Sequence, residues 1–155
     1  MRRESFEIEG YSHGGNPIPA VTRIGNLVFT GGISGIDTGT GTMPVALEDQ
    51  CSNMFVLADK VLKAANAKLE NVIKVTVFLK AGLSREALNR EWVKYFPDPH
   101  SRPVRHTLVN EHLAGGMLIQ CELMAVTNGA GLAEQGLCGR LAHTRTKPGG
   151  AGLQQ

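Results

Sequence analysis

The chain has 155 residues, 42% hydrophobic and 19% charged, and its formal net charge is +2. These values are typical of one soluble globular domain with a substantial core. The small net charge, and the lack of a basic run longer than Arg2-Arg3, argue against a nucleic-acid-binding surface. No apolar run approaches the ~20 residues of a transmembrane helix, and the first residues lack the apolar core of a signal peptide. We therefore expect a cytoplasmic protein without a membrane partner.

The cysteines and histidines do not follow the pattern of a disulfide framework or a metal site. Cys51, Cys121 and Cys138 make an odd number, without a CxxC pair, and two of them lie in apolar patterns. This favours buried free thiols in a reducing compartment. The five histidines are spread along the chain without ligand spacing, so no metal site is expected.

The first 44 residues predict short strands and loops. Phe6 and Ile8 alternate and suggest an edge strand inside a polar lead-in, residues 1–15, that we otherwise expect to be mobile. Residues 18–31 predict a hairpin that turns at Gly25-Asn26. The following loop, residues 33–44, lacks the lysine and the glycine spacing of phosphate-binding loops, so we expect a flexible connector.

The clearest helix spans residues 46–67. Apolar side chains recur at alternating spacings of four and three, which predicts one face packed on the core. Polar side chains, including Gln50, are expected on the opposite, solvent-facing side. The apolar positions are Leu47, Cys51, Met54, Phe55, Ala58, Val61, Leu62 and Ala65.

A strand and a second helix follow. Residues 72–80 alternate, with Ile73, Val75, Val77 and Leu79 expected on one face. Ser84 can cap a helix that runs to about residue 96 and ends before Pro97. Its apolar face is formed by Leu88, Trp92 and Tyr95/Phe96. On pattern alone, Asn89 beside this face is a surface amide.

Two further strands, residues 102–109 and 116–126, contain a fixed cation and a carboxylate. Arg105 lies in the first strand, and Glu122 interrupts the second, which is otherwise almost entirely apolar. If the two strands form an antiparallel hairpin, Arg105 falls opposite residue 121 or 122, and that one-residue difference decides whether the two charges share a face. The pair can therefore be a structural salt bridge or part of a site.

The pattern of buried elements ends at Thr127. Residues 1–127 therefore predict a single domain, and residues 128–155, rich in glycine, alanine and short polar residues, predict a disordered tail. The element order predicts an α+β fold, a small mixed sheet with two helices packed on one face. The uncovered sheet face favours oligomerisation.

In this order and spacing, several segments resemble the Rid family, the reactive intermediate deaminases, also called the YjgF family. The resemblance covers about residues 16–127. It rests on the segments 25–32, 69–79, 89–96, 102–105 and 120–126.

This resemblance implies a chorismate-mutase-like fold that assembles as a homotrimer with clefts between subunits. It implies hydrolysis of enamines and imines, such as 2-aminoacrylate and 2-iminopropionate, to 2-keto acids and ammonia without a cofactor. By motif match, Arg105 would bind the substrate carboxylate and Glu122 would position the water. The remaining cleft residues would be Ile18, Gly31, Gly32, Asn89 and Thr107.

Three of these positions depart from the family pattern. Ile18 replaces the usual tyrosine, Gly31 the usual serine and Thr107 the usual cysteine, which leaves the substrate open. One alternative is a pathway-specific deaminase of a larger substrate, similar to the 2-aminomuconate deaminases. Another is a trimer that binds small carboxylates, or another protein, without turnover. Ribonuclease activity or inhibition of translation, both long associated with this family, is disfavoured by the weak basic balance.

Overall fold

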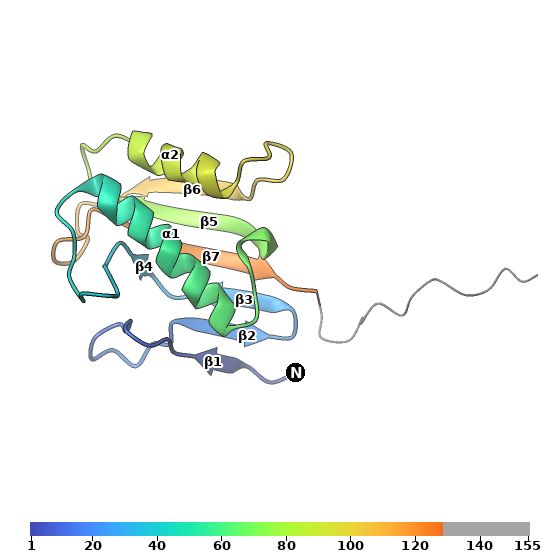
Figure 1. The fold of residues 1–155 in the computed structure, drawn as a ribbon. Helices are drawn as coiled ribbons and strands as arrows, with labels where there is room; N and C mark the ends of the chain where they lie inside the picture. The colour runs from blue at the N-terminus through green and yellow to red at the C-terminus, as the bar shows by residue number, and fades with distance from the viewer. Residues whose placement is uncertain (129–155) are drawn as a thin grey trace, which may run out of the picture.

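The computed structural model describes residues 1–128, so the expected tail lies outside the described residues apart from Asn128. Seven strands, two helices and one 3-10 turn follow each other along the chain (Figure 1). They are β1 (Glu4–Phe6), β2 (Val21–Ile24), β3 (Leu27–Thr30), β4 (Ile33–Ser34), α1 (Leu47–Ala64), the 3-10 turn (Leu69–Asn71), β5 (Val72–Leu79), α2 (Glu86–Tyr95), β6 (Val104–Val109) and β7 (Ile119–Val126).

One mixed sheet contains all the strands. Its order is β1-β2-β3-β7-β5-β6, and the short β4 pairs with β7. Only the β5–β6 pair is parallel, and the other pairs are antiparallel. Both helices lie on the same side of the sheet (Figure 1). The predicted α+β architecture, with two helices on one face of a mixed sheet, is therefore confirmed. Among the described residues, neither helix is long and apolar enough to span a membrane.

The expected hairpin between residues 102–109 and 116–126 is wrong, because β5 lies between β6 and β7. Helix α2 crosses over from β5 to β6, which makes this pair parallel and places β6 at the edge of the sheet. The segment after β6 then passes the end of β5. There the Asn110 N–H donates to the Leu79 carbonyl, and the Lys80 N–H donates to the Leu118 carbonyl. Strands β6 and β7, which follow each other in the sequence, are thus separated by β5 in the sheet.

Local periodicity predicted the other long elements well. The hairpin β2–β3 turns at Gly25-Asn26, where Gly25 has a φ of +60° that favours glycine. Helix α1 packs its apolar stripe against the sheet, and the Glu86 N–H at the start of α2 donates to Ser84 Oγ at 3.2 Å. Cys51 and Cys121 are buried free thiols, as expected. Cys138 lies outside the described residues.

Two side chains lie on the side opposite to the one expected. A β-bulge between Val72 and Lys74 shifts the alternation at the start of β5, and Ile73 is therefore 50% exposed. Gln50 is fully buried because its amide joins three backbone groups. Its Nε2 donates to the carbonyls of Pro44 and Gly116, and its Oε1 accepts from the Leu118 N–H.

The two segments expected to be mobile or flexible contain defined structure. In the lead-in, β1 pairs with β2, and the Tyr11 hydroxyl donates to the Gly32 carbonyl. The connector 33–44 begins with β4, which pairs with β7, and it closes an Asp37–Thr42 bridge. The polar composition of these segments did not reveal these long-range partners.

Candidate functional site

Arg105 lies on the edge strand β6 beneath helix α2. It is paired with Val75, which is buried under the helices, so the Arg105 side chain also points to the helix-covered face. Its Nη2 donates to Asn89 Oδ1 at 2.7 Å. Its Cζ lies over the Trp92 ring, 4.8 Å from the centroid. Asn89, which resembled a surface amide in the sequence, therefore contacts the candidate anchor directly.

The guanidinium of Arg105 lacks a counterion within residues 1–128. Its Nη1 is buried and has no hydrogen-bond partner, and none of the ion pairs in this part of the chain includes Arg105. Burial lowers the pKa of this guanidinium below its ordinary value, and the nearby charge of Arg85 lowers it further. An anionic ligand could neutralise this half-buried cation and accept a hydrogen bond from its free Nη1.

Glu122 faces the opposite side of the sheet. It is paired with Thr76, the neighbour of Val75 in β5, so its side chain points away from the helices. Arg105 and Glu122 are also two strands apart, which corresponds to roughly 10 Å at the usual strand spacing. The structural salt bridge considered from the sequence is therefore excluded within one chain. A small substrate cannot contact both side chains of the same protomer.

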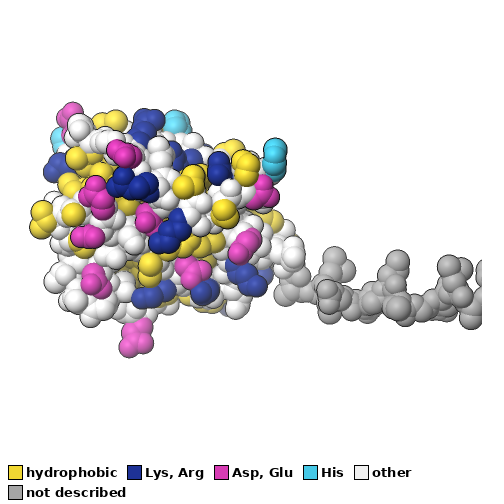
Figure 2. Space-filling model, turned by 45° about the horizontal axis from the view of Figure 1, so that its top comes forward, with side chains coloured by type: hydrophobic (Ala, Val, Ile, Leu, Met, Phe, Trp, Pro, Cys, Tyr) yellow, Lys and Arg dark blue, Asp and Glu magenta, His cyan; other side chains and the backbone are white. Residues whose placement is uncertain are grey.

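The open face around Glu122 exposes large apolar side chains. Leu27 and Phe29 are each 42% exposed and Val104 is 66% exposed, although all three lie in the sheet. Ile24 and Leu108 belong to the same face by register. On the helix-bearing side, by contrast, cationic and anionic side chains are interspersed (Figure 2). The open face therefore has the composition of a surface that another protein surface would cover.

A second group of expected site residues surrounds Gly31 and Gly32, at the end of β3. A Cβ at Gly31 would lie 2.9 Å from Cε1 and 3.0 Å from Nε2 of His13. His13 Nε2 lies 3.0 Å from the Gly32 carbonyl, and Tyr11 packs edge-on against the His13 ring. A Cβ at Gly32 would collide with Gln120, two residues before Glu122. The ring of His13 thus occupies the space that a side chain at position 31 would need.

The expected site residues therefore form two separate groups in one chain. Arg105, Asn89 and Thr107 lie along β6 and α2, and Thr107 points to the same side as Arg105 because it is two residues further on. The Gly31 region lies on the other side of β7 and β5. Ile18, which is 49% exposed, precedes β2.

Sequence reasoning missed two residues that contact these groups. His13 lies in a polar lead-in without any periodicity, so no local signal connected it with Gly31. Trp92 was correctly predicted as a core residue, but its contact with Arg105 depends on the β5–β6 pairing. A parallel β5–β6 pair needs a crossover connection, and α2 as that connection would lie over β6.

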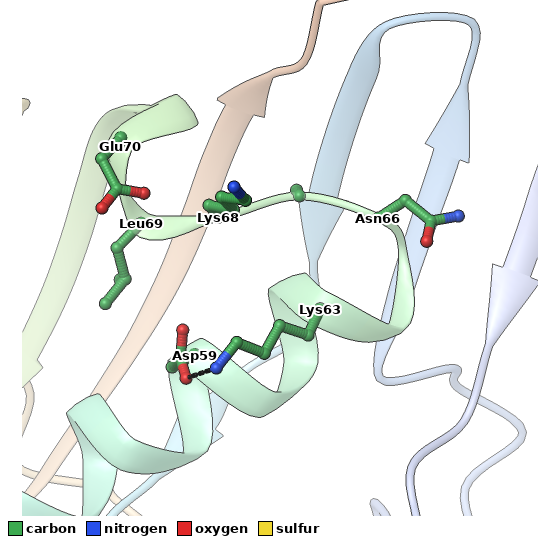
Figure 3. A pocket seen from close by; sticks show the side chains of 7 residues that line it. Asp59, Lys63, Asn66, Lys68, Leu69 and Glu70 are labelled. Carbon is green, nitrogen blue, oxygen red and sulfur yellow. Dashed lines mark hydrogen bonds and ion pairs between the residues drawn. The ribbon is translucent and has the colours of Figure 1, made fainter. Parts of the chain in front are cut away.

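One surface hollow lies outside both groups of expected site residues. It lies between the end of α1 and the 3-10 turn, and Asp59 and Lys63 pair with each other at its edge (Figure 3). None of the expected site residues lines this hollow. It offers no unpaired buried group and does not bear on the chemistry.

Comparison with known proteins identifies the family. The family model described as Endoribonuclease L-PSP matches residues 12–127. The chain belongs to this family, which includes the Rid/YjgF proteins. A RutC family protein of Pyrococcus horikoshii is 31% identical over 110 residues, which cover 70% of this chain and 86% of that protein. The 2-iminobutanoate/2-iminopropanoate deaminase of Dermatophagoides farinae is 25% identical over 111 residues, 71% of this chain and 85% of that protein.

Further members of the family include a longer plant relative and several solved structures. Reactive Intermediate Deaminase A of Arabidopsis thaliana is 30% identical over 110 residues, 70% of this chain, but the match spans only 58% of that longer protein. Among solved structures, a putative endoribonuclease of Thermotoga maritima superposes with a TM-score of 0.74 at 26% identity, covering 83% of this chain and all of that one. RidA from a Psychrobacter species gives a TM-score of 0.73 at 20% identity, covering 80% and 99%, which shows the fold alone.

Proposed function

We propose that this Rid-family protein hydrolyses small enamines or imines of 2-keto acids, with the substrate carboxylate held by Arg105 and the water positioned by Glu122. The observation that carries this proposal is the guanidinium of Arg105, which is half-buried, has a free Nη1 and lacks a carboxylate partner among residues 1–128. The planar fork of an arginine suits the carboxylate of such a substrate. Two relatives named as deaminases support the reaction class.

The proposal requires a homotrimer with sites between subunits. Arg105 and Glu122 lie on opposite faces of one sheet, so one substrate can reach both groups only if they come from different protomers. The exposed apolar side chains of the open face, such as Phe29 and Val104, support burial of this face in an assembly. A cleft between protomers would then combine Arg105 of one chain with Glu122 and the Gly31 region of another.

The proposed chemistry is the addition of water to a C=N bond. An enamine first tautomerises to the imine, and Glu122 accepts a proton as the water oxygen attacks the imine carbon. Glu122 then gives this proton to the nitrogen, which completes the carbinolamine. It next takes the hydroxyl proton and passes it to the amino group, so that the C–N bond breaks as the C=O bond forms and the 2-keto acid and ammonia leave. Arg105 contributes by holding the carboxylate so that the imine carbon faces the water. These intermediates also hydrolyse in water, so a modest rate increase is sufficient.

Carboxylate binding without turnover is the second candidate function. It is favoured by the same free guanidinium, which needs no catalytic partner in order to bind a keto acid. A deaminase of a larger substrate gains no support from Gly31, because the His13 ring fills the space beside this glycine.

The first experiment tests Arg105. Replacement Arg105→Ala should weaken binding of 2-oxobutanoate by about 1.5–3 kcal/mol, or roughly ten- to a hundredfold, as measured by equilibrium dialysis. Arg105→Lys should also be impaired, because it keeps the charge but loses the fork. Arg102→Ala is a matched control, because Arg102 donates to the carbonyls of Phe96 and Pro97 and should support stability without affecting binding. Unchanged binding in both Arg105 variants would refute the anchor.

The second experiment separates turnover from binding. A dehydratase that releases the imine is coupled to the protein, and formation of the keto acid is timed. Glu122→Gln should bring the rate close to that of hydrolysis without the protein, because the amide cannot accept the proton. Binding of 2-oxobutanoate should persist in this variant. A wild-type protein that binds the keto acid without accelerating hydrolysis would favour the binding function instead.

A further inference from the structure

Trp92 forms the surface on which the Arg105 guanidinium lies. It is the only tryptophan of the chain, it is 8% exposed, and its ring centroid lies 4.8 Å from Arg105 Cζ. Asn89, one helical turn earlier on α2, accepts the hydrogen bond from Arg105 Nη2. Helix α2 thus holds the cation by a ring and by an amide from the same face.

The ring of Trp92 is itself fixed by other aromatic side chains. Phe96 lies 4.8 Å from it between centroids in a tilted arrangement, and Phe55 of α1 meets it edge-on at 6.5 Å. These contacts tie the ring to both helices, so its orientation does not depend on Arg105. The ring therefore has the rigidity that a positioning residue needs.

The two contacts leave the Nη1 nitrogen of the guanidinium, with its two N–H donors, without a partner. Asn89 engages Nη2 and the ring engages the central carbon, whereas Nη1 is buried without a partner. An aliphatic residue at position 92 would leave the cation without this electrostatic compensation, because only an aromatic face attracts a positive charge.

We propose that Trp92 is a positioning residue that, together with Asn89, holds the Arg105 guanidinium in place so that Nη1 remains available for a substrate carboxylate. This proposal rests on the proposed function, in which Arg105 binds that carboxylate. Arg85 lies one turn before Asn89 on α2 and is close enough to act on the charge of Arg105. The surroundings of Nη1 therefore favour an anion over a neutral ligand.

The test compares Trp92→Leu with Tyr95→Leu. Both variants remove an aromatic ring of the same cluster, but Tyr95 stacks on Phe55, and among the described residues its ring is in aromatic contact with neither Trp92 nor Arg105. Trp92→Leu should weaken binding of 2-oxobutanoate by roughly three- to tenfold, whereas Tyr95→Leu should leave it unchanged. Trp92→Phe should retain most of the affinity, because it keeps an aromatic face. Thermal melts of the three variants control for general loss of stability.

A second readout does not require a ligand. In the free protein, the ring current of Trp92 should shift the side-chain proton resonances of Arg105, and Trp92→Leu should abolish that shift. The proposal is supported if Trp92→Leu loses both the shift and the affinity while Tyr95→Leu keeps both. A wild-type protein without the shift overturns it, and so does equal binding by Trp92→Leu and wild type.

The experiment also separates this proposal from the proposed function. If the wild type shows the shift and binds the keto acid but does not hydrolyse imines, the deaminase assignment fails and the positioning role stands. If the wild type shows the shift but binds no keto acid, both fail, and the contact is structural.

Discussion

The contact between Gly31 and His13 predicts that restoring a serine at position 31 destabilises this protein. A Cβ at Gly31 would approach Cε1 of His13 to 2.9 Å and the Pro19 carbonyl oxygen to 3.1 Å. The imidazole would have to leave, and its interactions with the Gly32 and Ile18 carbonyls would be lost. Overpacking of this kind costs about 1–3 kcal/mol, and we expect Gly31→Ser to lower the free energy of unfolding by that amount.

A double-mutant cycle in urea tests this prediction. His13→Ala alone should cost about 0.5–1.5 kcal/mol, and the double variant should be more stable than the sum of the two losses by about 0.5–3 kcal/mol. Gly15→Ser is the control, since a Cβ there meets nothing within 4 Å, and it should change stability by less than about 0.5 kcal/mol. A neutral Gly31→Ser, or strictly additive losses, would refute the argument that His13 fills this space.

Three further predictions follow from other contacts. Gln50→Leu should lower the free energy of unfolding, measured by urea titration, by about 2–4 kcal/mol, because it removes three hydrogen bonds. The exposed Asp49→Leu is the control, and an equally small change in both variants would contradict the prediction. Burial raises the pKa of the Cys51 and Cys121 thiols from 9.0 to about 12, so their contribution to stability is complete below about pH 9 and is lost as the pH rises toward 12. The urea midpoint should therefore fall between about pH 9 and pH 12, less so in Cys51→Ala, and an identical fall in that variant would exclude the thiol as a cause. Light scattering should give about three times the chain mass of 16.6 kDa, whereas a monomer would leave Arg105 and Glu122 without a shared site.

The elements that could be predicted from the sequence are those determined by local patterns. Helix α1 has an uninterrupted apolar stripe, and the β2–β3 hairpin has a glycine turn between two apolar runs, so both follow from neighbouring residues. The pairing of β6 could not be predicted in the same way. It depends on which edge of β5 the chain reaches after α2. Contacts between residues far apart in the sequence determine this.

The candidate site shows the same division. Arg105 and Glu122 attract attention in a sequence because charged residues are rare within buried strands, but their relative placement depends on the strand between them. Gln50 was predicted on the solvent-facing side of α1, but it is buried. Its hydrogen-bond partners lie in the loop before α1 and in the loop before β7, and a helical pattern does not reveal them. Periodicity assigns a residue to a face, and it does not show which backbone groups need a partner there.

The position of β7 in the sheet has a consequence for folding during synthesis. This strand is the last of the described elements, yet it lies at the centre, between β3 and β5, and also pairs with β4. Until it emerges from the ribosome, β3 and β5 have no common neighbour, and the backbone N–H and C=O groups along their facing edges remain unpaired. Folding of the sheet therefore waits for contacts of high sequence separation, which slows folding and exposes the nascent chain to aggregation until the final strand is inserted.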